Sequence, residues 1–230
     1  MTDVDKPFAR RIKSFVVRST RMTVGQQRGW DTYWDAMGVE PCETILDFQQ
    51  LFGNQNPLVF EIGFGMGASL FEMAQAHPEH NFIGVEVHRP GVGAILASAG
   101  DAGLTNLRVL CCDANLVIDK MLTDNALSRV QLYFPDPWHK TRHHKRRLVQ
   151  PDFVQRIRKK LAKGGLFHMA TDWQPYAQHM LAIMNAQEGY QNQSSDGSYV
   201  DKPDYRPQTK FERRGLKLGH GVWDLVYEKC

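Results

Sequence analysis

Short apolar runs alternate with longer segments of helical spacing over most of the chain, beginning near Pro57. The runs of strand length cover residues 58–62, 81–85, 107–111, 130–134 and 166–169. The segments with apolar residues at helical spacing cover residues 68–76, 90–99, 114–122, 153–161 and 176–186. This alternation predicts an α/β fold in which a mostly parallel sheet carries helices on both faces.

The N-terminal part of the chain departs from this alternation. Residues 1–30 are rich in Lys and Arg and poor in large apolar side chains, which favours a flexible arm. A short helix is expected after it, from the aromatic residues Trp30, Tyr33 and Trp34. We therefore expect a basic, partly flexible arm over residues 1–34 and one domain over residues 35–230.

The C-terminal part also has its own pattern. Gly164 and Gly165 are expected to end one helix before the strand that follows. A polar stretch at residues 191–207 then leads to two further strands, at 210–213 and 222–228. We expect the last strand to be antiparallel to the others.

Charge is distributed unevenly, although the formal net charge is only +3. Residues 1–30, 138–163 and 202–217 hold 23 of the 28 Lys and Arg and sum to +18, whereas the rest of the chain sums to −15. Such asymmetry favours a polyanionic partner, because Lys and Arg that contact phosphates release condensed counterions. Three unrelated solvated surfaces would give the same pattern.

The composition argues against a membrane or secreted protein. The chain is 42% hydrophobic, but no apolar segment is long enough to span a bilayer, and the first residues lack the pattern of a secretory signal. No C-x-x-C pair occurs among the four cysteines, which are Cys42, Cys111, Cys112 and Cys230. We therefore expect a cytoplasmic protein with buried, reduced thiols and no metal.

A glycine-rich loop follows the first predicted strand. The sequence FEIGFGMGASL places Gly63, Gly65 and Gly67 between a strand and a helix. Glycine allows a tight turn and close approach of a ligand at the carboxyl end of a strand. The loop also fits the dinucleotide pattern G-x-G-x-x-A, so an NAD-dependent oxidoreductase is an alternative.

Three acidic residues favour a different ligand. Glu61, Glu86 and Asp113 stand at the ends of successive predicted strands, so we expect their carboxylates to face one crevice. They would repel a pyrophosphate but would hold an amino group, ribose hydroxyls and a sulfonium, with Glu86 accepting from the ribose. This describes S-adenosylmethionine better than NAD. Each acid alone could also be a helix cap or a solvated charge.

The sequence YFPDPWHKTRHHKRR follows the fourth predicted strand. Pro135 and Pro137 restrict the backbone around Asp136, and Trp138 offers a flat face on which a purine could stack. A proline-stiffened turn with a capping Asp and a core Trp is the simpler alternative. His139, His143 and His144 match no standard zinc spacing and lie among cations, so we expect no metal there.

Several motifs together resemble one family, the tRNA (guanine-N7-)-methyltransferases. These motifs are E-I-G-x-G-x-G, G-V-E, the strand end at Asp113, FPDPWHKxRHxKRR, TD at 171–172, TKFE at 209–212 and, in the arm, SFVVRSTRMTVGQQ. The resemblance implies a Rossmann-like class I methyltransferase fold. It also implies transfer of a methyl group from S-adenosylmethionine to N7 of guanosine 46 in the variable loop of tRNA.

The resemblance also implies roles for individual residues, with Asp136 as the catalytic acid. The cofactor would be contacted by Glu61, Gly63, Gly65, Gly67, Glu86, Asp113 and Asp136. The substrate would be bound by Lys140, Asp172, Thr209, Lys210, Phe211 and Glu212. The tRNA backbone would lie against Arg142, His143, His144, Lys145, Arg146 and Arg147. Asp172 could instead cap a helix, and 209–212 could be a plain edge strand.

The chemistry suits these residue types, because N7 of neutral guanine carries a lone pair and needs no general base. Three alternatives stay open beside it. One is a methyltransferase of an exocyclic base amine, whose D/N-P-P-aromatic motif is related to PDPW. The others are an NAD oxidoreductase and a non-catalytic RNA-binding protein. The sequence does not distinguish a monomer from a homodimer.

Overall fold

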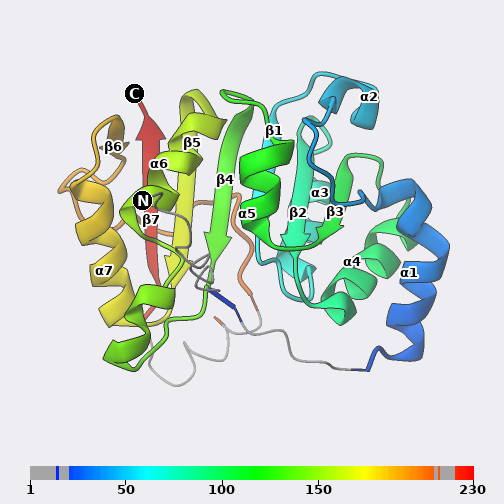
Figure 1. Ribbon diagram of the computed structural model, residues 1–230, viewed down its shortest axis with the longest axis horizontal. Helices are drawn as coiled ribbons and strands as arrows, with labels where there is room; N and C mark the ends of the chain where they lie inside the picture. The colour runs from blue at the N-terminus through cyan, green and yellow to red at the C-terminus, as the bar shows by residue number, and fades with distance from the viewer. Residues whose placement is uncertain (1–13, 16–20, 210–211, 213–220) are drawn as a thin grey trace, which may run out of the picture.

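The computed structural model describes residues 14–15, 21–209, 212 and 221–230 of the chain (Figure 1). A single seven-stranded sheet forms its centre, in the order β3-β2-β1-β4-β5-β7-β6. The strands are β1 (Leu58–Ile62), β2 (Asn81–Glu86), β3 (Leu107–Cys111), β4 (Leu127–Tyr133), β5 (Leu161–Thr171), β6 (Tyr190–Asn192) and β7 (Trp223–Lys229). The first five strands are parallel, and β7 is antiparallel to β5 and β6. The predicted mostly parallel sheet with an antiparallel C-terminal strand is confirmed.

Helices cover both faces of the sheet, as predicted. The described helices are α1 (Val24–Met37), α2 (Phe48–Phe52), α3 (Ala68–Ala76), α4 (Arg89–Asp101), α5 (Ala114–Leu116), α6 (Pro151–Lys160) and α7 (Gln174–Asn185). A π-helical turn, Val117–Met121, continues α5. One apolar cluster joins one sheet face to this turn, α6 and α7, and the other cluster joins the opposite face to α3, α4 and α1. No helix of the described chain is long and apolar enough to cross a membrane.

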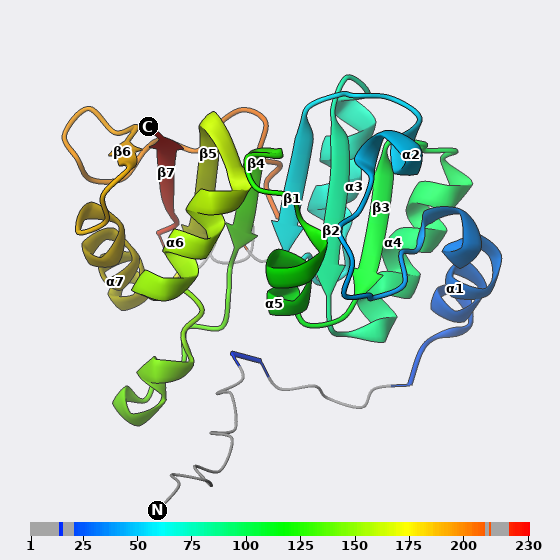
Figure 2. The same cartoon turned by 45° about the horizontal axis from the view of Figure 1, so that its top comes forward.

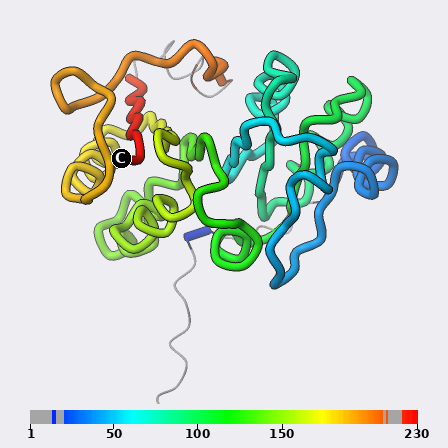
Figure 3. Tube along the Cα trace, turned by 90° about the horizontal axis from the view of Figure 1, so that it is seen from above, coloured from blue at the N-terminus to red at the C-terminus, as the bar shows by residue number. Residues whose placement is uncertain are grey.

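One region of the second face carries no helix in the described part of the chain. Over β4, β5 and β7, the face is crossed by residues 193–209, which follow β6 (Figure 3). This segment forms no helix or strand beyond an isolated bridge between Val200 and Asp224. Polar side chains, described below, attach it to the sheet.

Helix α1 begins earlier than the aromatic residues suggested. Thr23 caps it, because its hydroxyl accepts from the Gln26 amide while the Gln26 side chain accepts from the Thr23 amide. The helix packs closely on α4 at the β3 end of the sheet (Figure 2), where a Cβ on Gly29 would lie 2.4 Å from the Gly93 carbonyl oxygen. The predicted boundary at residue 34 therefore falls inside a packed helix.

The C-terminal half differs from the prediction in two places. Helix α6 ends at Lys160 and β5 begins at Leu161, so Gly164 and Gly165 lie inside the strand instead of ending the helix. The register between β4 and β5 shifts there, and Gly164 has a φ of +75°, which suits the irregularity to glycine. The short strand β6 was not predicted. The strand predicted at 210–213 lies outside the described residues except for Glu212.

Candidate active site

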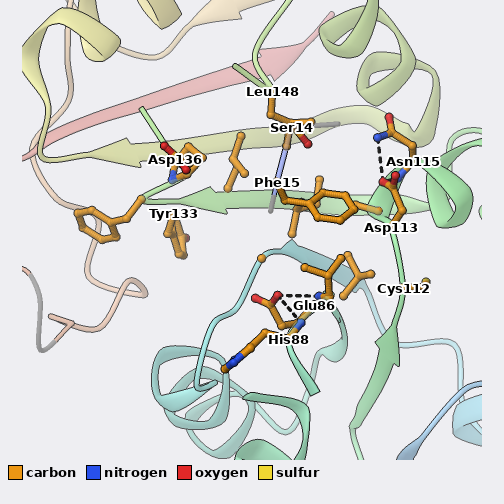
Figure 4. A pocket seen from close by; sticks show the side chains of 18 residues that line it. Ser14, Phe15, Glu86, His88, Cys112, Asp113, Asn115, Tyr133, Asp136 and Leu148 are labelled. Atoms are coloured by element: carbon orange, nitrogen blue, oxygen red, sulfur yellow. Dashed lines mark hydrogen bonds between the residues drawn. The ribbon is translucent and has the colours of Figure 1, made fainter. Parts of the chain in front are cut away.

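A cavity of about 590 Å³ opens at the carboxyl ends of β1, β2, β3 and β4 (Figure 4). Its walls include Gly63, Glu86, Asp113 and Asp136, each of which follows or ends a different strand. Carboxyl ends of parallel strands share one edge of a sheet, which explains how residues far apart in sequence meet here. The structure thus brings together four of the residues predicted for cofactor binding.

The glycine loop lies against Glu86. Gly65 adopts a φ of +60° and donates its amide to Glu86 Oε2 at 2.9 Å. Gly67 has a φ of +79° and precedes α3, where a Cβ would lie 2.5 Å from Ile95. Both glycines are therefore required by backbone conformation, and Gly67 also by a close approach.

Glu86 fixes two neighbouring backbone segments while lining the cavity. Its Oε1 accepts from the amides of Val87 at 2.6 Å and His88 at 2.9 Å. Its Oε2 accepts from the glycine loop. Each carboxylate oxygen can accept more than one hydrogen bond, so a hydroxyl pair in the cavity could still be accepted.

Asp113 occupies the next wall of the cavity. Its Oδ1 accepts from the backbone amide and the side-chain amide of Asn115, both at 2.9 Å, and thereby caps α5. Cys112 beside it is half-buried, and burial, together with Cys111 and Asp113, raises the pKa of its thiol to about 12. All four cysteines are free, but none is fully buried, so the expectation of buried thiols is wrong.

Glu61 does not line the cavity. Side chains alternate between the two faces of a strand, so Phe60 and Ile62 point toward the apolar cluster that includes α6 and α7. Glu61 points to the opposite face, where only 3% of it is exposed. Burial raises the pKa of the Glu61 carboxyl to about 8, although Arg129 opposes the shift. The expectation that three carboxylates face one crevice is therefore wrong for Glu61.

The PDPW segment holds Asp136 at the mouth of the cavity. Phe134 and Trp138 have φ values of +50° and +47°, which non-glycine residues rarely adopt. The Phe134 amide donates to the Ala170 carbonyl at 2.7 Å, and Asp136 Oδ1 accepts from the Trp138 amide at 3.0 Å. Asp136 is exposed, and its Oδ2 makes no hydrogen bond to the described residues.

Trp138 is not the open stacking face that the sequence suggested. Its ring is half-buried, with the Arg146 guanidinium 3.9 Å from the ring centroid and the His143 ring edge-on to it. Its indole nitrogen donates to the Ser14 carbonyl at 3.1 Å. Trp173, which follows the TD motif, was not predicted to take part in the site; it is 39% exposed beside His139.

Two residues of the N-terminal arm also line the cavity, although no individual role was predicted for them. Ser14 and Phe15 lie at its wall next to Leu148 (Figure 4). The only sequence signal was their place inside SFVVRSTRMTVGQQ.

The predicted RNA-binding run forms a 3-10 turn, Thr141–Arg146, that projects beyond the strand ends (Figure 2). Lys140, Arg142 and Lys145 are exposed and pair with no acidic side chain of the described residues. Burial and the neighbouring cations lower the pKa of His143. His144 is half-buried and forms no hydrogen bond to an acidic side chain of the described residues.

Arg147 differs from the rest of that run. It is buried, and its Nε donates to the Pro137 carbonyl at 2.9 Å, while its guanidinium lies 4.9 Å from the Tyr176 ring centroid. The prediction that Arg147 faces RNA is therefore wrong in its placement. Its guanidinium instead supports the backbone directly after Asp136.

The residues predicted for the substrate are placed differently from one another. Asp172 is exposed at the end of β5, and Trp173, not Asp172, is the N-cap of α7. Thr209 and Glu212 are joined by a reciprocal pair of hydrogen bonds, in which each backbone amide donates to the other side chain. Glu212 is buried and paired with Arg206. Lys210 and Phe211 lie outside the described residues.

Comparisons with known proteins agree with this geometry. The family described as "Putative methyltransferase" matches residues 55–225. A tRNA (guanine-N(7)-)-methyltransferase of Aeromonas hydrophila is 58% identical over 225 residues, which cover 98% of this chain and 95% of the relative. The enzyme of the same description from Psychromonas ingrahamii is 60% identical over 222 residues, covering 96% and 91%.

Solved structures resemble the chain in fold alone. The 16S rRNA methyltransferase KamB has a TM-score of 0.58 at 16% identity and covers 81% of this chain and 95% of its own. A 16S rRNA (adenine(1408)-N(1))-methyltransferase has a TM-score of 0.54 at 16% identity, covering 80% and 91%. The sheet order and these likenesses establish the class I methyltransferase fold. By its full-length similarity to the curated relatives, the chain belongs to the family of the tRNA (guanine-N(7)-)-methyltransferases.

Proposed function

We propose that this protein transfers the methyl group of S-adenosylmethionine to N7 of guanosine 46 in the variable loop of tRNA. The observation that carries the proposal is the cavity, where the glycine loop, Glu86 and Asp113 face the PDPW segment with Asp136. Family membership supplies the reaction class, and the cavity supplies a place for it.

The residues around the cavity fit the proposed methyl donor. A volume of about 590 Å³ lies within the usual range of small-molecule sites. Glu86 would accept from the ribose hydroxyls, Asp113 would accept from the adenine side of the ligand, and the glycine loop would allow its close approach. When bound, S-adenosylmethionine supplies a methyl group carried on a positively charged sulfur. The surrounding carboxylates would stabilise that positive charge.

The protein's contribution to the reaction is mainly alignment. The N7 lone pair of guanine forms the new N–C bond while the C–S bond breaks and sulfur keeps the electron pair, so no proton has to be removed first. Asp136 would accept from the N–H edge of the guanine and orient N7 toward the methyl group. Its negative charge would also stabilise the positive charge that develops on the purine.

The exposed cations of the 3-10 turn would hold the tRNA backbone. Lys140, Arg142 and Lys145 project beyond the strand ends on the Asp136 side of the cavity. Asp172 lies at the end of the neighbouring strand β5, on the same edge of the sheet. The arrangement would let a nucleotide reach Asp136 while phosphates contact the cations.

Incubation of unmodified tRNA with radiolabelled S-adenosylmethionine, followed by nucleoside analysis, tests the proposal. We expect 7-methylguanosine, and we expect no label on a tRNA whose guanosine 46 is replaced by adenosine. A methyl group on an exocyclic amine would identify the alternative methyltransferase activity instead. Titration with NAD serves as a control, and we expect no binding.

A further inference from the structure

A buried ion cluster lies behind the active site, on the face of the sheet that residues 193–209 cross. Arg206 at its centre has no exposed surface. Its Nη1 and Nη2 donate to the two carboxylate oxygens of Glu212 at 2.7 and 2.9 Å. Its Nε and Nη2 donate to the two oxygens of Asp224 at 2.7 and 2.8 Å. One guanidinium thus joins Asp224 of strand β7 to Glu212.

The cluster continues through His168 to the end of β4, three residues before Asp136. His168 Nε2 lies 2.8 Å from Asp224 Oδ1, and its Nδ1 lies 2.9 Å from the Tyr133 hydroxyl and 3.0 Å from the Tyr205 hydroxyl. Burial lowers the pKa of His168, which favours the neutral ring. In a neutral ring, Nε2–H donates to Asp224, because a carboxylate only accepts, and Nδ1 accepts from the tyrosine hydroxyls.

The guanidinium also lies next to the strand end itself. Its carbon is 5.8 Å from the ring centroid of Tyr133 and 5.8 Å from that of Phe134. Both residues line the cavity, and Phe134 is two residues before Asp136. Arg206 therefore meets the end of β4, β7 and Glu212 at one point.

Stability alone gives little reason for such a cluster. Desolvation of buried ion pairs is unfavourable, and well-packed apolar side chains are often at least as stabilising in their place. A charged clamp with several directed hydrogen bonds does, however, permit only one arrangement of the groups it joins. Residues 193–209 form no helix or strand that could otherwise set their position.

We propose that Arg206 is a positioning residue for methyl transfer, and that Glu212 acts through Arg206 rather than by contact with the guanosine. The clamp sets Thr209 and Glu212 relative to the segment after β4 that contains Asp136. Glu212 is 4% exposed, unlike Glu86, and both of its carboxylate oxygens accept from Arg206. The inference rests on the proposed methyl transfer to tRNA.

The central test is a double-mutant cycle of Arg206→Lys and Glu212→Gln, with kcat and KM for tRNA measured at saturating S-adenosylmethionine. Arg206→Lys keeps the charge but loses the fork, and we expect kcat to fall at least about tenfold. We expect KM for tRNA and the Kd of S-adenosylmethionine to change less than about threefold. Glu212→Gln should lower kcat in the same way, and the double variant should be no slower than Arg206→Lys alone.

Asn106→Ala serves as the stability control. The Asn106 side-chain amide donates to the carbonyls of Ala74, His77 and His80 at the opposite edge of the sheet. Its loss should lower Tm and leave the residues that line the cavity unchanged. We expect it to keep kcat when assayed below its Tm, at the same margin as the Arg206 and Glu212 variants.

Three results would overturn the inference. One is an Arg206→Lys variant with wild-type kcat. Another is a double variant whose losses multiply, because Glu212 would then act independently of Arg206. The third, which decides even if Arg206→Lys fails to fold, is a Glu212→Gln variant that raises KM and leaves kcat unchanged. Absence of methyl transfer by the wild-type protein would instead contradict the proposed function.

Discussion

The acids that line the cavity differ from the acids buried behind the sheet in exposure and in hydrogen-bond partners, although the sequence does not distinguish the two groups. Glu86, Asp113 and Asp136 line the cavity and accept from amides close to them in sequence, and Glu86 accepts in addition from Gly65 of the glycine loop. Glu61 and Asp224 are buried on the other face, one with a raised pKa and one clamped by Arg206. Position at a strand end therefore does not decide a role; the direction of the side chain and its existing partners do.

The basic run shows the same distinction. In the 3-10 turn, Arg142 and Lys145 meet no acid of the described residues. In α6, Arg156 pairs with Asp119 at 2.8 Å, and Lys160 pairs with Asp124 at 2.6 Å. One dense stretch of positive charge thus contains a surface open to phosphates and a helix whose cations are partly neutralised.

The largest effect is expected from Asp136→Ala. Loss of a preorganised group at the reacting base should lower kcat about 10²–10³-fold with tRNA affinity largely kept. Asp136→Asn would separate the charge from the hydrogen-bonding shape. Single-turnover rates and a binding titration measure the two quantities; equal losses of S-adenosylmethionine affinity and rate would limit Asp136 to holding the cofactor.

Glu86→Gln tests the cavity side of the comparison at the level of ligand binding. A charged hydrogen bond contributes about 1.5–3 kcal/mol, so S-adenosylmethionine affinity should fall about 10–100-fold. Glu61→Gln is the matched control, and its affinity should stay within about threefold because Glu61 does not line the cavity. Calorimetric titration measures both, and equal losses in the two variants would contradict the division.

Glu61→Gln should also change how stability depends on pH. The pKa of Glu61 is about 8 in the folded protein and 4.5 in the unfolded chain. Between these two pH values, the folded protein keeps the proton that the unfolded chain has lost. The folded state then binds more protons, so its free energy of unfolding falls as pH rises between these values. This loss of unfolding free energy amounts to at most about 1.4 kcal/mol per pH unit, and the variant should not show it. Denaturant titrations at pH 5 to 8.5 would refute this if the two curves ran parallel.

The smallest effect is expected on the salt dependence of tRNA binding. Lys145→Ala should reduce the slope of log affinity against log salt by about 0.7–0.9, the value for one lost phosphate contact. Lys160→Ala should leave the slope unchanged, since Asp124 already pairs with that ammonium. Filter binding at several salt concentrations measures both slopes, and equal changes would mean that α6 also meets the tRNA.

Much of the fold could be predicted because it depends on local pattern. The alternation that began near Pro57 located five parallel strands, and the loop after β1 and the PDPW segment were correctly expected at their ends. The errors arose where a residue's partner is distant. Gly164 was expected to end a helix, whereas it lies at a register shift that depends on pairing with the distant strand β4. Trp138 was expected to be open, whereas Arg146 and Ser14 contact it in the folded chain.

By itself, the sequence determined the alternation of β1 to β5 with the helices between them and the motifs that mark the family, since apolar periodicity and turn residues act over a few neighbours. Only the tertiary structure decided that Glu61 is buried, that Arg147 supports the segment after Asp136, and that Arg206 joins Asp224 to Glu212. These outcomes depend on which face of the sheet a side chain meets and on groups many residues away. Burial and pairing are properties of that packing, so no local pattern records them.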